Sequence, residues 1–285
     1  MKNMRLGMKI ALGFGVLIVI AGILGAVGIW NMGKVERSSG ILSAEYVPQV
    51  AMAMNLSNAA SRLMYEMRGY GLSEEKSFYE AALKEAEALD KALKDGEELE
   101  ASAKNLTGLK EQLEKATAAA AQYKQLMKKT NELILKIDQN RAQLNEAAGH
   151  YMKNSQDFLD SQIQTFNGEL AAKKIDKLAE RQKKINLVHD LVTVGNQTRI
   201  AAFRSMALRD PEFIKGAQGN FDVMEGIFQE LRKITRQDAN IRQIEAIRDA
   251  AGKYKSLLNE FLANWTELQK VASERTIAGN MVLET

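Results

Sequence analysis

A cationic side chain stands on the apolar face of a predicted helix near residue 200. In the stretch VGNQTRIAAFRSMALRD, residues 194–210, an advance of 100° per residue places Arg199 on the same stripe as a set of small and apolar residues: Val188, Val192, Gly195, Ala202 and Met206. A cation on a buried helix face is costly unless an anion pairs with it. Arg199 is therefore expected to face the interior of a bundle and to need a negative partner.

The neighbours of Arg199 favour a ligand as that partner. Gly195, Thr198 and Ala202 are small and are expected to leave room beside the guanidinium, and Asn196 at the edge of the stripe adds a hydrogen-bonding group. A guanidinium suits a carboxylate because its parallel N–H donors match the two oxygens. Two alternatives stay open, namely an internal salt bridge to another helix and a side chain that extends to solvent.

Other polar residues are weaker candidates for a ligand site. Arg141 falls on a helical stripe between Ile137 and Leu144, where a structural charge paired with Asp210 or Glu74 is the favoured interpretation. Three more candidates lie on an earlier helix: Arg68 at the edge of the apolar stripe, Arg62 pointing away as a solvated charge or a dimer contact, and Tyr65 as a pocket-lining or ordinary packing residue.

Enzymatic chemistry has no support in the sequence. There is no cysteine, the two histidines, His150 and His189, lie far apart in the sequence, and no phosphate-binding loop or nucleophile motif occurs. We therefore expect no enzyme, no metal and no cofactor. The net charge of +3 implies no nucleic-acid partner.

The first thirty residues predict a membrane helix. Residues 10–30 carry no charge, and their 21 positions span about 30 Å, the thickness of a bilayer core. Lys2, Arg5 and Lys9 precede this run, which places residues 1–9 in the cytoplasm and residues 36–285 outside it, in a bacterial periplasm. A signal peptide is the alternative, but its apolar run would be shorter and an Ala-x-Ala site would follow.

The rest of the chain predicts an all-α fold. Helices are expected over about 38–72 and 74–100, from about Thr107 to near FNGEL (residues 166–170), over about 172–209 and 211–236, and from Asp238 onward. Two helix ends are similar, MRGYGLSEEKSF and FRSMALRDPEF, which pairs Arg68 with Arg204 and Leu72 with Leu208. The helix lengths then predict two stacked four-helix bundles that share two long helices.

The opening MRLGMKIALGFGVLIVIAGILGAVGIWNMGKV, followed by six helices with these two turns, resembles the N-terminal part of a bacterial methyl-accepting chemotaxis protein with a helical bimodular sensor domain. Some sensor histidine kinases carry the same domain. The resemblance implies an inner-membrane homodimer that senses small organic acids in one or both modules. It also implies relay through a second membrane span to a cytoplasmic signalling module.

The chain closes on RTIAGNMVLET without a second apolar span, so we expect the natural gene to continue past Thr285 into such a span within roughly 20 to 40 residues. Two other functions stay open. One is the input domain of a sensor histidine kinase, and the other is a membrane-anchored coiled-coil scaffold, which gap-free Leu and Ile stripes would favour.

Overall fold

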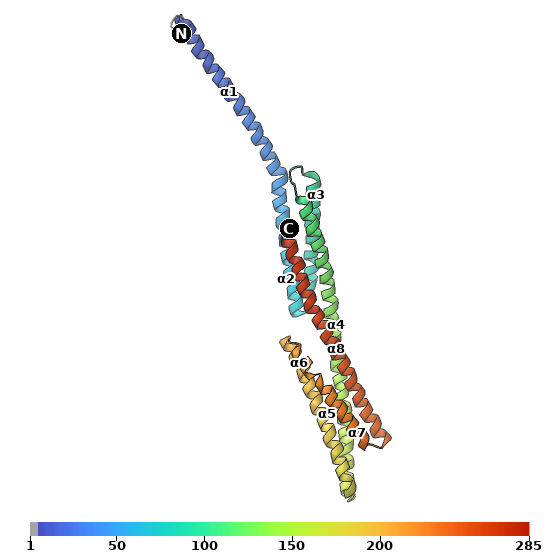
Figure 1. Ribbon diagram of the computed structural model, residues 1–285. Coiled ribbons are helices and arrows are strands. Elements are labelled where there is room, and N and C mark those ends of the chain that lie inside the picture. Colours follow the sequence, from blue (N-terminus) through green and yellow to red (C-terminus); the bar gives the residue numbers. More distant parts are fainter. Residues whose placement is uncertain (1–4, 285) are drawn as a thin grey trace. The chain divides into compact units, whose positions relative to one another are not determined.

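The computed structural model describes residues 5–284, and every regular element in that range is helical (Figure 1). Lys2 and Thr285, which the sequence predictions use, lie outside the described residues. The elements are, in order, α1 (Leu6–Ile41), a π-helical turn η1 (Leu42–Tyr46), α2 (Val47–Ser73), α3 (Lys76–Ser102), α4 (Leu109–Ala171), α5 (Ile175–Leu208), α6 (Glu212–Ala217), α7 (Gly219–Ile234) and α8 (Asp238–Glu284).

The chain divides into two compact units. Unit 1 comprises the chain up to Met127 and residues from Glu274 onward, and unit 2 comprises Lys128–Ser273. Helices α4 and α8 are long enough to contribute to both units, so each unit contains parts of four bundle helices. The predicted all-α fold, with one candidate membrane helix and two bundles that share two long helices, is confirmed.

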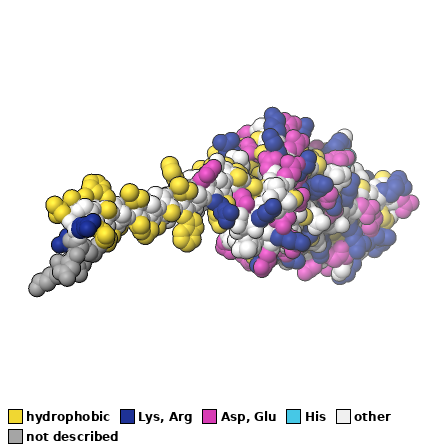
Figure 2. Space-filling view, turned by 90° about the horizontal axis from the view of Figure 1, so that it is seen from above, with side chains coloured by type: hydrophobic (Ala, Val, Ile, Leu, Met, Phe, Trp, Pro, Cys, Tyr) yellow, Lys and Arg dark blue, Asp and Glu magenta, His cyan; other side chains and the backbone are white. Residues whose placement is uncertain are grey.

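Helix α1 has the surface of a membrane-spanning segment. Its 36 residues include no buried side chain, and Figure 2 shows it as a run of hydrophobic side chains with basic residues near its start. Among residues 5–284, the helical stretch Leu6–Ser73 is long and apolar enough, by length and composition, to cross a membrane. The predicted run over residues 10–30 lies within it.

Helices α2 and α3 of unit 1 form an antiparallel pair joined by a short turn at Glu74 and Glu75 (Figure 1). Glu74 ends α2 in the left-handed conformation, with φ of 62°, and the Glu75 N–H donates to Ser73 Oγ at 3.2 Å. The helices approach closely here, because a Cβ built on Gly69 would lie only 2.5 Å from the Phe78 ring. Glycine at position 69 therefore lets the Phe78 ring pack against α2.

The helix predicted over residues 211–236 of unit 2 is broken in two. Asp210 Oδ1 accepts the Glu212 N–H at 3.0 Å just before α6. However, α6 ends at Ala217 and α7 begins at Gly219. Gly216 and Gly219 flank the break, and glycine is the weakest helix former after proline, so the prediction of one uninterrupted helix was wrong.

The helix ends at Glu74 and Arg209 correspond to each other, but the predicted pairing of Arg68 with Arg204 is shifted by one residue from this correspondence. Arg209 ends α5 in the left-handed conformation, as Glu74 ends α2, and the two positions differ by 135 (209 − 74) rather than 136. The buried faces agree with this register: Leu63, Met67 and Tyr70 correspond to Thr198, Ala202 and Ser205. Arg68 therefore corresponds to Phe203, and Arg199 corresponds to Met64.

Candidate functional site

Arg199 lies at the edge of the buried face of α5 and not at its centre. The buried residues of α5 include Gly195, Thr198 and Ala202, whereas Arg199 is half-buried. The sequence pattern placed Arg199 on the buried face. In the structure the neighbouring residue Thr198, although polar, occupies that core position. One residue corresponds to 100° around a helix, so this shift moves the guanidinium to the rim of the core.

The Arg199 side chain lines a small cavity of unit 2, about 10 Å³ in volume. Four helices supply the lining: Ala148 and Tyr151 from α4, Gly195, Thr198 and Arg199 from α5, Phe221 and Met224 from α7, and Ala251 and Tyr254 from α8. Arg199 is the one charged member of this lining. Of the two residues predicted to lie beside Arg199 in a ligand site, Thr198 lines the cavity and Asn196 does not.

No carboxylate of residues 5–284 forms an ion pair with Arg199. The closest described interactions of the guanidinium are with aromatic rings, since it lies 5.9 Å from the centroid of Phe203, and its charge acts on the Tyr254 phenol. Burial raises the pKa of Tyr254 to about 12, against the opposing effect of the Arg199 charge. The phenol is therefore neutral and does not compensate the guanidinium.

The Thr198 hydroxyl is already engaged within the protein. It donates to the Val194 carbonyl at 2.8 Å and accepts a hydrogen bond from the Asn220 side chain at 3.0 Å. This second bond connects α5 to α7. Asn220 is the second residue of α7, directly after the break between α6 and α7, and the sequence analysis did not single it out.

The room expected beside Gly195 is occupied by Tyr151. A Cβ built on Gly195 would lie 2.4 Å from Tyr151 Cε1, so the glycine allows the ring to lie against α5. The Tyr151 hydroxyl donates to the Leu191 carbonyl at 2.7 Å, and burial raises the pKa of the phenol. The small residues therefore serve packing, and the expectation that they leave a ligand-sized space was wrong.

The remaining predicted residues do not join this site. Arg62, Tyr65 and Arg68 are exposed residues of α2 in unit 1, with Tyr65 67% exposed. Arg141 is a half-buried residue of α4 in unit 2, and it does not line the Arg199 cavity.

Unit 1 contains a buried arginine that the sequence analysis missed. Arg275 is 6% exposed, donates to the Met67 carbonyl at 3.1 Å and forms a hydrogen bond with the Tyr123 hydroxyl. Burial lowers the pKa of Arg275 and raises that of Tyr123 to about 12. The signal was present, because Arg275 interrupts a helical stripe that continues beyond Leu268 through Val271, Ala278 and Val282.

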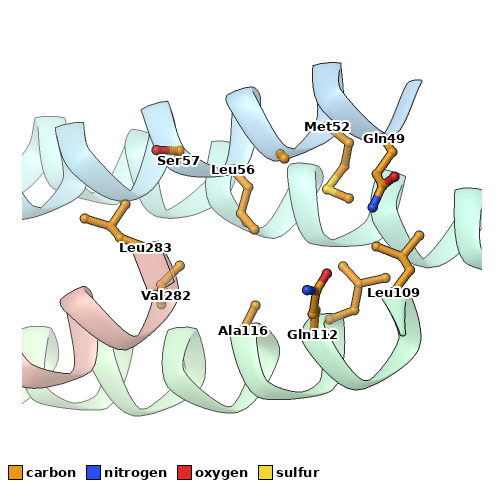
Figure 3. A pocket seen from close by; sticks show the side chains of 11 residues that line it. Gln49, Met52, Leu56, Ser57, Leu109, Gln112, Ala116, Val282 and Leu283 are labelled. Carbon is orange, nitrogen blue, oxygen red and sulfur yellow. The ribbon is translucent and has the colours of Figure 1, made fainter. Parts of the chain in front are cut away.

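A larger cavity of about 240 Å³ lies in unit 1 between α2, α4 and the end of α8 (Figure 3). Figure 3 shows Gln49 and Met52 facing Leu109 and Gln112 across it. None of its lining residues is charged. It therefore lacks a cation that would recognise an organic acid.

A helix of membrane-spanning length that continues into helical bundles is the layout of a membrane-anchored sensory protein. The chain matches, over residues 3–180, a family model described as "Four helix bundle sensory module for signal transduction". This range is more than half of the chain, and the chain belongs to this family, the sensory modules of methyl-accepting chemotaxis proteins. The predicted recognition is thereby confirmed at the level of the family.

A solved structure also shows similarity, that of the "TorS sensor domain - TorT complex in the presence of TMAO". It covers 82% of this chain and 95% of its own, with 12% sequence identity and a TM-score of 0.40. The search of curated proteins found no match.

Proposed function

We propose that the chain is the ligand-sensing input region of a bacterial transmembrane chemoreceptor, and that Arg199 of unit 2 binds the carboxylate of a small organic acid. The observation that carries this proposal is a half-buried guanidinium that lines a cavity and has no ion pair among the described residues. Such a charge is costly until an anion meets it, and a carboxylate matches its paired donors.

The internal repeat supports a special role for Arg199. The corresponding residue in unit 1 is Met64, whose thioether packs against Gly279 of α8, close to the position that a Cβ on that glycine would occupy. The same place in the repeated helix is therefore filled by an apolar side chain in unit 1. A cation in unit 2 is not required by the architecture, which favours a functional reason for it.

The size of the cavity restricts the mode of binding. A volume of about 10 Å³ holds about one water molecule, so an organic acid requires side chains to move. An open groove of about 420 Å³ on α7 and α8 shares Phe221, Met224 and Ala251 with the cavity lining. Rotation of Phe221 or Met224 would join the two spaces, and we propose that binding opens this connection.

The same proposal assigns a topology. Residues 10–30 cross the bacterial inner membrane, residues 1–9 lie in the cytoplasm and residues 36–285 lie in the periplasm, because Arg5 and Lys9 precede the uncharged run. The chain has no cysteine, so the labelling of a single introduced cysteine shows on which side of the membrane that residue lies. A membrane-impermeant maleimide should label Ser102→Cys in intact cells and Gly7→Cys only after lysis. Labelling in the reverse order contradicts this orientation.

We also propose that the chain forms a homodimer through the outer face of α2. Residues 46–61 carry no charge, and the face opposite the core exposes a row of apolar side chains at helical spacing: Val47, Val50, Met54, Tyr65 and Leu72. Two copies anchored in one membrane present this face in the same orientation. Oxidation should cross-link Met54→Cys and not Lys84→Cys on α3, and equal cross-linking of both contradicts the interface.

A thermal-shift screen tests the ligand proposal. The detergent-solubilised full chain is melted with formate, acetate, succinate, malate and citrate, with chloride at equal ionic strength as the salt control. At least one acid should raise the melting temperature in a concentration-dependent manner. The rise should vanish in Arg199→Met, which introduces the residue type of position 64, and persist in Arg204→Met, which removes an exposed charge of the same helix. If no acid stabilises the chain, the scaffold function is favoured.

A further inference from the structure

The helix that joins the membrane segment to unit 1 contains a break in its hydrogen-bond register. It is α-helical up to Ile41, passes through the π turn Leu42–Tyr46 and is α-helical again from Val47. The Val47 N–H bonds to the Leu42 carbonyl, five residues back. Pro48 explains the break, because it has no N–H and its ring would clash with the carbonyl four residues earlier in a regular α-helix.

A carboxylate within the π turn holds a loop from another part of unit 1. Glu45 Oε2 accepts the Asn105 backbone N–H at 2.9 Å, and Oε1 accepts the Lys104 N–H at 3.3 Å and the Asn105 side-chain amide at 2.9 Å. Partial burial opposes ionisation of the Glu45 side chain, but these three hydrogen bonds outweigh it and lower the pKa of Glu45. The charged form, which accepts all three bonds, is therefore the stable form.

The loop that Glu45 holds is itself attached to the core of unit 1. Leu99 and Leu106, on either side of Lys104 and Asn105, pack against a cluster of Met52, Leu109 and Leu113. The backbone of the loop is also fixed, since the Ala103 N–H bonds to the Leu99 carbonyl at 2.9 Å and the Thr107 N–H to the Asn105 carbonyl at 3.0 Å. Glu45 thus connects the helix that leads from α1 to a fixed part of the bundle.

We propose that Glu45 is a positioning residue that fixes the rotational orientation of α1 relative to the bundle of unit 1. The π turn includes one residue more than an α-helical turn, which corresponds to a rotation of about 100° between the segments on either side. Without the Glu45 bonds, the turn is free to redistribute that rotation. A sensor that relays a signal through its membrane helix needs this orientation to be defined. The inference rests on the proposed function only in taking α1 as the membrane helix.

Pulsed electron–electron distance measurements test the proposal in the full chain, mixed with an excess of unlabelled chain and reconstituted in lipid nanodiscs so that only distances within one chain are measured. Spin labels are placed at Ser39→Cys on α1 and at Lys110→Cys on α4, both exposed and free of competing cysteines. The comparison is between the labelled parent chain, Glu45→Ala and Glu36→Ala. Glu36 is an exposed carboxylate of α1, so its removal changes the charge equally without touching the loop.

The labelled parent and Glu36→Ala should give one narrow distance distribution. Glu45→Ala should give a broadened or displaced one, with shifts of up to about 8 Å, the chord of a 100° rotation at the radius of a helix with side chains. Helical content and melting temperature of each variant show whether it is folded. A Glu45→Ala distribution that superimposes on the parent overturns the proposal, as does equal broadening in Glu36→Ala. The ligand screen uses neither variant, so failure of one proposal is distinguishable from failure of the other.

Discussion

Substitution of Gly195 by alanine should destabilise unit 2, although alanine is the better helix former. The new Cβ would lie 2.4 Å from Tyr151 Cε1 and 3.2 Å from Cζ, so the ring must move. Overpacking of this kind costs about 1–3 kcal/mol. Displacement of the ring also strains the bond from the Tyr151 hydroxyl to the Leu191 carbonyl, worth about 0.5–1.5 kcal/mol. The higher helix propensity of alanine offsets about 1 kcal/mol of this loss in the free energy of unfolding.

The net loss for Gly195→Ala is therefore about 0.5–3.5 kcal/mol in the free energy of unfolding, or a fall of about 1–14 °C in melting temperature for a unit of this size. The assay is thermal unfolding of the detergent-solubilised chain followed by circular dichroism. Gly149→Ala is the matched control, because Gly149 is an exposed α4 glycine with open space at its Cβ position, and it should be stabilised by about 0.5–1 kcal/mol. Equal stabilisation of the two variants would refute the close fit of Tyr151 against α5.

Two further predictions concern polar contacts of unit 2. Asn264→Leu should lower the free energy of unfolding by about 1–3 kcal/mol, because the buried Asn140 loses the amide that donates to it at 2.8 Å. The double variant Asn140→Leu/Asn264→Leu should lose much less than the sum of the two single variants, and additive losses in a thermal double-mutant cycle would contradict this. Hydrogen bonds from Arg181 lower the pKa of Glu169, so this pair stabilises the α4–α5 hairpin above the ordinary glutamate pKa and the benefit is lost as the pH falls through the lowered value. The melting-temperature gap between the parent and Glu169→Gln should therefore narrow below about pH 4.5, and a constant gap would count against the assignment.

The helical layout was predictable from the sequence because it depends on local signals. The uncharged run of residues 10–30 and the two helix ends MRGYGLSEEKSF and FRSMALRDPEF each indicate their structure within a few residues. Proline and glycine signals were also present at the π turn and at the break after Ala217. Whether such a residue produces a π turn, a break or a regular helix depends on tertiary packing, which the sequence pattern does not show.

The candidate site was less predictable because its details depend on how neighbouring helices meet. Arg199 lines the cavity of unit 2, but its displacement from the centre of the buried face followed from Thr198, whose hydroxyl is satisfied by Val194 and Asn220. The insertion of Tyr151 beside Gly195 depends on the register of α4 against α5, which periodicity does not give. Arg275, by contrast, had a clear signal on the stripe of α8.

Isothermal titration calorimetry of the full chain, with the acid that raises its melting temperature most in the thermal screen, measures binding at Arg199. We expect one binding site per chain. Binding should be lost in Arg199→Met and weakened at least about tenfold in Arg199→Lys, because an ammonium lacks the paired donors of a guanidinium. An unchanged dissociation constant in Arg199→Met would show that Arg199 does not bind the acid.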